Sequence, residues 1–212
     1  MEDLFDLRRN YSLKTLDIKD VTSDPVSQFE VWINEAISAQ VAEPNAMTLS
    51  TSTPEGKVSS RVVLLKQVKE DGFVFFTNYD SKKATQIDSN PYCALNFLWL
   101  ELERQVRIEG IVSKISPEES DLYFNVRPEK SKLGAWSSPQ SKEIPNREYL
   151  DGLMSQTEKR FDNGIVTRPE NWGGYIVKPL LIEFWQGRSN RLHDRICYTL
   201  ENNRWHISRL AP

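Results

Sequence analysis

The sequence predicts a mainly β (α+β) fold: one antiparallel, Greek-key-like β-barrel with peripheral helices. Segments with strand patterning recur along most of the 212 residues, separated by short turns that contain glycine or asparagine. Fewer stretches have helical spacing, and we find no repeat, linker or low-complexity segment. A chain of this length can bury one core, so residues 1–212 are expected to form a single domain.

The first expected element is an amphipathic helix. Asp24 is a suitable N-cap, and Pro25 suits the first helical position. Helical spacing then places five apolar residues on one face: Phe29, Trp32, Ile33, Ala36 and Ile37. Three strand-patterned segments follow at 46–53, 58–68 and 73–78, and their short connections predict an antiparallel meander.

The remaining chain alternates between helices and strands. Helices are expected over 81–89, over 116–127, where Ser116 and Glu119 form a capping box, and over 146–162. Strands are expected at 93–100, 104–115, 173–187, 195–200 and 204–210.

Composition excludes several classes of function. The formal charge is -3 and the pI about 5.6, so no overall positive field favours nucleic acid or an anionic membrane surface. We expect a soluble cytoplasmic protein, because the start lacks a signal-peptide core and no apolar run could span a membrane. Cys93 and Cys197 form neither a disulfide framework nor a metal site, so no metal is expected.

Two pairs of cations are the first candidates for ligand contacts. Arg61 and Lys66 are five residues apart on a strand, which predicts opposite faces, although both could reach solvent at strand ends. Lys82 and Lys83 begin a helix, where cations are unfavourable unless an anion binds there. A phosphate held by backbone amides, by these lysines and by the hydroxyl of Ser81 or Thr77 would supply that anion.

A second phosphate-binding site is expected at the end of the 116–127 helix. Tyr123 and Arg127 are four residues apart on one face, and Ser131 follows the break at Pro128. Such a trio suits a small phosphate monoester, although an exposed pair without a ligand is equally compatible with the spacing. Alternation along 104–115 puts three polar side chains on one face, which suits either a heteroaromatic ligand or a wet sheet face: Gln105, Arg107 and Glu109.

Several blocks, taken in order, resemble the pyridoxine 5'-phosphate oxidase family over nearly the whole chain: LRRNY, RVVLLK, TNYDSKKA, LERQVRIEG, YFNVRPEKSKLGAWSSPQS, NWGGY, IEFWQGRSNRLHDR and RLAP. The resemblance implies an FMN-binding split β-barrel that forms a homodimer with flavin sites at the subunit interface. It implies that pyridoxine or pyridoxamine 5'-phosphate is oxidised to pyridoxal 5'-phosphate by hydride transfer to the flavin. Oxygen then accepts the electrons and gives hydrogen peroxide.

The resemblance also assigns site residues. FMN contacts are expected at Arg61, Val62, Val63, Leu64, Leu65, Lys66, Phe76, Thr77, Lys82, Lys83, Gln105, Gln140, Ser141, Trp185 and Arg195, the last four from the partner subunit. Substrate contacts are expected at Arg8, Arg9, Asn10, Tyr11, Lys66, Tyr123, Arg127, Ser131, Arg191, Leu192 and His193. Many relatives have arginine at position 82, so Lys82 lacks the two-pronged donor expected there.

The segment RSNRLHDR, residues 188–195, is expected to direct its charges at ligands. Arg191 would clamp and polarise the substrate, and His193 would orient it or handle a proton. Residues 1–23 are expected to close over the site, and residues 170–212 to build the dimer and the substrate site. Two alternatives remain: an FMN-dependent reductase of another small molecule, or a non-catalytic protein that binds a phosphorylated vitamer.

Overall fold

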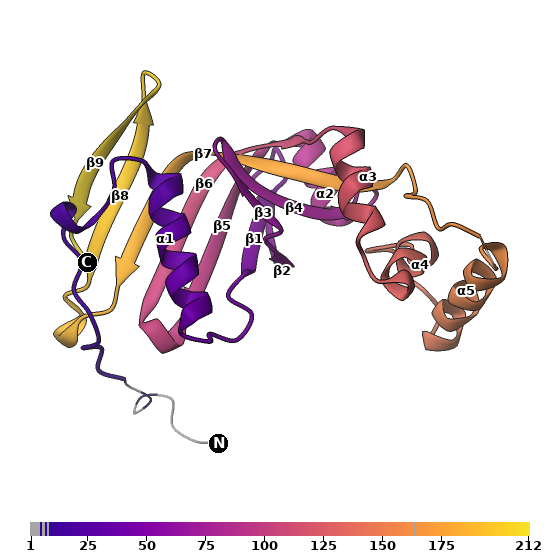
Figure 1. Ribbon diagram of the computed structural model, residues 1–212, viewed down its shortest axis with the longest axis horizontal. Helices are drawn as coiled ribbons and strands as arrows, with labels where there is room; N and C mark the ends of the chain where they lie inside the picture. Colours follow the sequence, from indigo (N-terminus) through magenta and orange to yellow (C-terminus); the bar gives the residue numbers. More distant parts are fainter. Residues whose placement is uncertain (1–4, 6, 8, 163) are drawn as a thin grey trace.

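The structure, a computed structural model, describes residues 5, 7, 9–162 and 164–212 (Figure 1). One antiparallel sheet of nine strands dominates the described chain, with the order β2-β1-β5-β6-β7-β4-β3 and with β8 and β9 added beyond β7. The mainly β class is confirmed. The strands are β1 (Ala46–Ser52), β2 (Val58–Leu64), β3 (Gln67–Lys69), β4 (Gly72–Asn78), β5 (Tyr92–Trp99), β6 (Arg104–Lys114), β7 (Trp172–Gln186), β8 (Asp194–Glu201) and β9 (Arg204–Leu210).

The expected meander is wrong, because the segment 58–68 forms two strands and not one. Leu65 enters the core between β2 and β3, and its amide donates to Asn45 O at 2.8 Å. The next amide, from Lys66, donates to Val74 O at 2.8 Å and so joins β4. Consecutive strands β2 and β3 thus lie at opposite ends of the strand order, and the sheet curls like part of a barrel.

Helix α1 (Pro25–Ser38) covers one face of the sheet, and two later helices pack at the start of β7. The predicted first helix is confirmed as α1, capped by Asp24, whose Oδ2 accepts from Ser27 N at 2.7 Å. Ile37 does not pack in the core as its spacing suggested, because it is 56% exposed. The other α-helices are α2 (Lys82–Ser89), α3 (Pro117–Asn125), α4 (Glu129–Ser137), which was not expected, and α5 (Arg147–Arg160).

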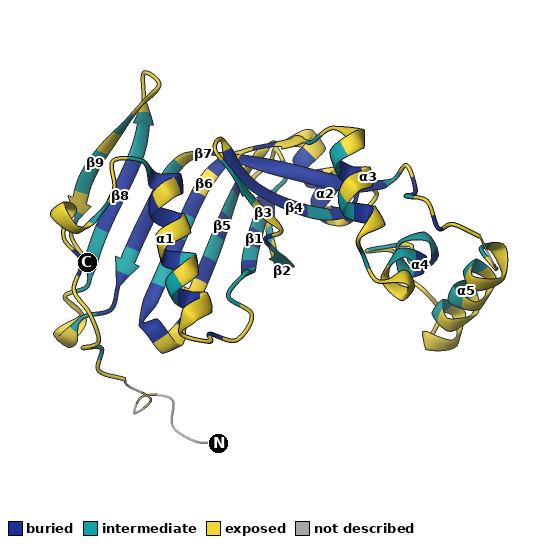
Figure 2. Ribbon diagram, in the orientation of Figure 1, coloured by how far each residue is buried: buried dark blue, intermediate teal, exposed yellow. Residues whose placement is uncertain are grey.

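Two apolar clusters hold these layers together. The larger lies between α1 and the inner face of the sheet, where Phe29 packs against Phe97 of β5 and Trp32 against Phe184 of β7. Figure 2 shows the buried stretches of these strands. The smaller joins α3 and α4 to the start of β7 and centres on Phe124 and Trp172. Among the described residues, no helix is both long and apolar enough to cross a membrane.

Candidate active site

A pocket of about 550 Å³ lies where β2, β4 and α3 approach the start of α4. It brings together residues that the sequence assigned to two different ligands. Its lining includes Arg61, Val62, Val63, Leu64, Lys66, Phe76, Thr77, Lys83, Tyr123, Arg127, Ser131 and Gln140. We call this space the cation pocket, because Arg61, Lys66, Lys83 and Arg127 line it and no carboxylate does among the described residues.

Lys83 is the most buried of these cations, with 8% of its surface exposed. Its Nζ donates to Gln140 Oε1 at 2.9 Å, Thr77 Oγ1 at 3.0 Å and Ser81 Oγ at 3.3 Å, all neutral acceptors. Burial, with a smaller contribution from Arg61, lowers the pKa of Lys83 to about 8. A buried ammonium with only neutral partners favours binding of an anion.

Arg61 and Lys66 line the same pocket, although strand alternation predicted opposite faces. The prediction was wrong because β2 ends at Leu64 and the chain turns at Leu65, which resets the alternation. Nη1 of Arg61 donates to Thr51 Oγ1 at 2.7 Å and to Leu49 O at 3.1 Å. Its guanidinium is therefore fixed by neutral groups and keeps its full charge for a ligand.

Three aromatic rings support the other side of the cation pocket. The ring of Tyr123 stacks on Phe76 with centroids 3.9 Å apart, and Trp172 lies nearly parallel to both. The guanidinium of Arg127 lies 4.4 Å from the centre of the Trp172 ring, and its buried Nη1 has no hydrogen-bond partner in the described structure. Burial lowers the pKa of Arg127, the electrostatic cost of a charge without a counterion. Tyr123, Arg127 and Ser131 line one wall together, as their spacing suggested.

A second group of predicted residues surrounds a different cavity, of about 810 Å³. Arg9, Asn10, Tyr11, Arg191 and His193 line it, together with Arg188 and Asn190. Arg8, also predicted here, lies outside the described residues. The ring of Tyr11 meets the ring of His193 edge-on with centroids 6.0 Å apart, so the N-terminal segment touches the predicted substrate loop.

The arginines of the segment 188–195 differ in whether they have partners within the chain. Nη1 of Arg188 pairs with Asp194 at 2.8 Å, and Nε of Arg195 pairs with the buried Glu183 at 2.7 Å. Arg188 and Arg191 both line the cavity, and of the two only Arg191 has no ion pair in the described structure. Two of the three arginines thus have carboxylate partners within the chain, and Arg191 has none in the described structure.

His193 is fixed in one hydrogen-bonding state. Its Nδ1 accepts the backbone N–H of Arg188 at 3.1 Å, so the neutral ring carries its proton on Nε2. Burial and the charge of Arg191 lower the pKa of His193, and Asp194 opposes them. At neutral pH the ring is therefore uncharged and can donate a hydrogen bond from Nε2.

Gln105, Trp185 and Arg195 form a row across the outer face of the sheet. The β6–β7 register pairs Gln105 with Trp185, and the β7–β8 register pairs Trp185 with Arg195. This row lies at the end of β7, whereas Trp172 of the cation pocket is its first residue. Thirteen strand steps separate the two tryptophans, roughly 40 Å along the strand. One chain therefore holds the two groups of site residues far apart (Figure 1).

Some predicted contacts do not lie at these cavities. Lys82 is exposed and absent from the lining of the cation pocket, whereas its neighbour Lys83 belongs to it. Leu65 is in the core, and Ser141 and Leu192 are exposed outside both linings. Gln140, which was expected from the partner subunit, lies in the cation pocket of its own chain and accepts from Lys83 Nζ there.

Sequence reasoning missed three residues that support these sites. Trp172 belongs to the NWGGY motif, but nothing in its spacing indicated a platform under Arg127. Glu103 and Asp194 accept hydrogen bonds from the N-terminal segment, over separations of 90 and 178 residues in the chain. Contacts between segments so distant have no local sequence signal.

Comparisons with known proteins agree with this geometry. The family model described as "Pyridoxamine 5'-phosphate oxidase" matches residues 33–158, and the model of the "Pyridoxine 5'-phosphate oxidase C-terminal dimerisation region" matches residues 172–212. A curated pyridoxine/pyridoxamine 5'-phosphate oxidase of Cytophaga hutchinsonii is 51% identical, with 99% of each chain covered. The protein of the same name from Paraburkholderia phymatum is 52% identical over the full length of both chains.

Solved structures share the fold. PhzG of Burkholderia lata, solved in complex with tetrahydrophenazine-1-carboxylic acid, has a TM-score of 0.89 and 28% identity, covering 95% of this chain and all of the other. A pyridoxamine 5'-phosphate oxidase-related, FMN-binding protein of Nostoc punctiforme has a TM-score of 0.69 and 17% identity, covering 87% and 97%. The family matches and the full-length relatives together establish that this chain belongs to the pyridoxine/pyridoxamine 5'-phosphate oxidase family.

Proposed function

We propose that this protein oxidises pyridoxine 5'-phosphate and pyridoxamine 5'-phosphate to pyridoxal 5'-phosphate with FMN as cofactor and oxygen as final acceptor. The observation that carries the proposal is the cation pocket, in which four cations line one space with no carboxylate among the described lining residues. Such a surplus of positive charge suits ligands that carry phosphate groups. Full-length relatives with this activity in their names support the choice of substrate.

The residues present fit the phosphate end of FMN. Lys83 and Arg61 would hold the phosphate, with Thr77 and Gln140 as further polar partners, because all four line the pocket and only neutral groups occupy them now. Lys66 lies beside them for the second ligand. FMN, when bound, accepts the hydrogen and electrons removed from the substrate carbon and passes the electrons to oxygen, which yields hydrogen peroxide.

The substrate phosphate would bind to Tyr123, Arg127 and Ser131. The buried, unpartnered Nη1 of Arg127 is the strongest sign, because a buried guanidinium donor is costly to leave without an acceptor. The contact with the Trp172 ring restricts the orientation of the Arg127 guanidinium. Holding the substrate in one pose lowers the barrier by restricting its motion before reaction.

A homodimer would complete each site. Gln105, Trp185 and Arg195 lie at the far end of β7 from the cation pocket, so a second copy is needed to bring such a row to it. The outer face of the sheet carries exposed apolar side chains that a partner would cover: Val58, Val62, Tyr92, Leu98 and Ile111. The family model over residues 172–212 names this region for dimerisation.

From the partner subunit, Arg191 and His193 would face the substrate ring. Arg191 supplies an unpaired charge, and His193 supplies an Nε2–H donor, because its Nδ1 is already occupied. This state favours orientation of the substrate over removal of a proton by His193. We place the enzyme in the cytoplasm, a proposal supported by the two buried free thiols Cys93 and Cys197 and testable by cell fractionation.

An aerobic assay with FMN and pyridoxine 5'-phosphate tests the proposal. Equal amounts of hydrogen peroxide and aldehyde product are expected, and FMN should bind with one molecule per chain. Binding of the vitamer without turnover would favour the non-catalytic alternative. Flavin binding without reaction of either phosphate would favour a reductase of another small molecule. Unphosphorylated pyridoxine is the matched control, because it lacks only the group that Arg127 is proposed to hold.

A further inference from the structure

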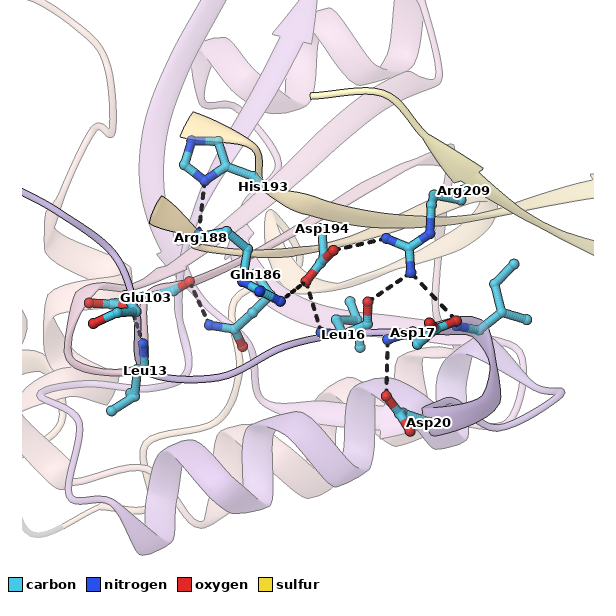
Figure 3. Close-up of polar contacts among 12 residues, drawn as sticks. Leu13, Leu16, Asp17, Asp20, Glu103, Gln186, Arg188, His193, Asp194 and Arg209 are labelled. Atoms are coloured by element: carbon cyan, nitrogen blue, oxygen red, sulfur yellow. Dashed lines mark hydrogen bonds and ion pairs between the residues drawn. The ribbon is translucent and has the colours of Figure 1, made fainter. Parts of the chain in front are cut away.

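The N-terminal segment Tyr11–Leu16, here called the strap, lies beside the loop 188–193 without forming a helix or strand. Three of its backbone amides donate to carboxylates on other parts of the chain. Glu103 Oε2 accepts from Ser12 N at 2.8 Å and from Leu13 N at 2.9 Å, and Asp194 Oδ2 accepts from Leu16 N at 3.1 Å (Figure 3). Two carboxylates therefore hold the two ends of the strap.

Asp194 connects three segments of the chain. Besides the strap, it accepts from Arg188 Nη1 at 2.8 Å through Oδ2 and from Arg209 Nη1 at 2.9 Å through Oδ1. Arg209 returns to the strap, because its Nη2 donates to Leu16 O at 3.0 Å. Figure 3 shows this closed set of contacts between strap, loop and last strand.

Glu103, which holds the other end of the strap, has a fixed position just before β6. It is buried in a left-handed backbone conformation with φ of 54°, and its carbonyl accepts from Gly187 N at 2.7 Å. Gly187 in turn makes room for the strap, because a Cβ there would lie 2.8 Å from Cγ of Tyr11. The strap therefore packs closely against Glu103 and Gly187.

The same contacts reach the groups assigned to the substrate. Arg188, held by Asp194, donates its backbone N–H to His193 Nδ1 at 3.1 Å. Tyr11, at the start of the strap, places its ring against His193 and against Trp185, with centroids 6.0 and 5.8 Å apart. Movement of the strap or of Arg188 would change the environment of His193 on two sides.

We propose that Asp194 and Glu103 are positioning residues for the oxidation: they form a two-point latch that seats the strap against the loop 188–193 and so fixes Tyr11 and His193 at the substrate. This inference rests on the proposed function. Neither carboxylate lines the cavity around His193 among the described residues, so each acts through the groups that it holds.

The test uses Asp194→Asn and Glu103→Gln, which keep side-chain shape and remove charge. The matched control is Asp17→Asn. Asp17 lies 3.5 Å from the same Arg209 but has no hydrogen bond to the strap, to Asp194 or to Glu103 in the described structure, and asparagine caps helices as well as aspartate does. Each FMN-reconstituted protein is digested with limiting trypsin, which can cleave the strap after Lys14. KM and kcat for pyridoxine 5'-phosphate and the Kd for FMN are then measured.

Both latch variants should be cleaved faster than wild type and should show roughly a tenfold rise in KM, as for the loss of one charge-assisted hydrogen bond, with the Kd for FMN unchanged. Asp17→Asn should match wild type in each measurement. The latch is overturned by unchanged cleavage in both variants, or by faster cleavage with unchanged KM and kcat. If Asp194→Asn does not fold, Glu103→Gln alone decides. A wild-type protein without oxidase activity would overturn the proposed function, whereas the cleavage rates would still test the latch.

Discussion

Two regions of this protein are rich in arginine and lysine, but they differ in whether those charges have partners. In the cation pocket, Lys83 and Arg127 meet only neutral groups or no acceptor among the described residues. In the segment 188–195, Arg188 and Arg195 are paired with Asp194 and Glu183. Buried cationic groups without a counterion raise the free energy of the folded chain, so they indicate a ligand, whereas paired cations already contribute to the fold without one.

Removal of Arg127 should have the largest effect on turnover. We expect Arg127→Ala to lower kcat/KM for pyridoxine 5'-phosphate roughly 100-fold, near the upper range for a hydrogen bond to a charged group. Oxidation of unphosphorylated pyridoxine should change little, because that substrate has no phosphate to lose. Steady-state kinetics with both compounds measure the difference. An equal decrease in kcat/KM for the two compounds would mean that Arg127 does not bind the phosphate group.

The adjacent lysines of α2 provide a matched pair. Lys83 is buried in the cation pocket and Lys82 is exposed outside it. Lys83→Ala should weaken FMN binding by roughly 30-fold and Lys82→Ala by less than about threefold, because exposed charges are screened by water and salt. Flavin fluorescence titrations give both values. Similar losses at the two positions would remove the distinction between them.

The low pKa of Lys83 predicts opposite effects of pH on binding and stability. Above pH 8 the ammonium loses its proton, so FMN affinity should fall, by at most about tenfold per pH unit. In the unfolded chain the ordinary pKa is 10.5, so between pH 8 and 10.5 the unfolded state binds more protons. This group therefore makes the ligand-free protein more stable as pH rises. Titrations and denaturation over this range check both slopes, and Lys83→Met should flatten them.

Trp172 should have a smaller effect than the cation that it supports. Trp172→Leu removes the ring under Arg127 and leaves the charge in place. A cation–π contact is worth about 1 kcal/mol, so KM for the phosphorylated substrate should rise about fivefold. The FMN affinity serves as the internal control. An unchanged KM would show that Arg127 is held by its other neighbours.

The smallest effect is expected in the paired region. Arg188→Ala removes a partly exposed ion pair with Asp194, so the free energy of unfolding should fall by about 0.5–1 kcal/mol. FMN affinity should stay within about twofold of wild type, because Arg188 is not in the cation pocket. Chemical denaturation and flavin titration measure the two quantities. A loss of FMN affinity as large as that of Lys83→Ala would contradict the comparison of the two regions.

Local signals predicted most of the elements well. Asp24 and Ser116 begin α1 and α3 as expected, because an N-cap is a contact between neighbours in the chain. Alternation placed Gln105, Arg107 and Glu109 on one face of β6, and in the structure they alternate with buried residues, because alternation is also a local property. The strand order could not be derived in this way, because it depends on the turn at Leu65 and on pairing between distant strands.

For the candidate site too, local spacing was informative, whereas contacts between distant segments were not predictable. Spacing on α3 grouped Tyr123 with Arg127, and both line the cation pocket. Lys83 and Thr77, which the family motifs indicated as FMN contacts, line the same pocket, and their role there stays a prediction. For the segment 188–195, charge density did not indicate the ion pairs, because the carboxylate beside Arg195 comes from Glu183 on the neighbouring strand. A sequence gives the number of charges in a segment, but their partners depend on the fold.

In the proposed homodimer, the length of β7 would make catalysis depend on protein concentration. Trp172, its first residue, lies beside Arg127, and its last residue, Gln186, precedes the loop that contains His193. Each reaction centre would therefore combine one end of β7 from one subunit with the other end from its partner, and a separated subunit would have no complete centre. Specific activity should then decline on dilution as subunits part. Mixing two variants that are each defective at a different end of β7 should restore activity at one of the two centres in the mixed pair.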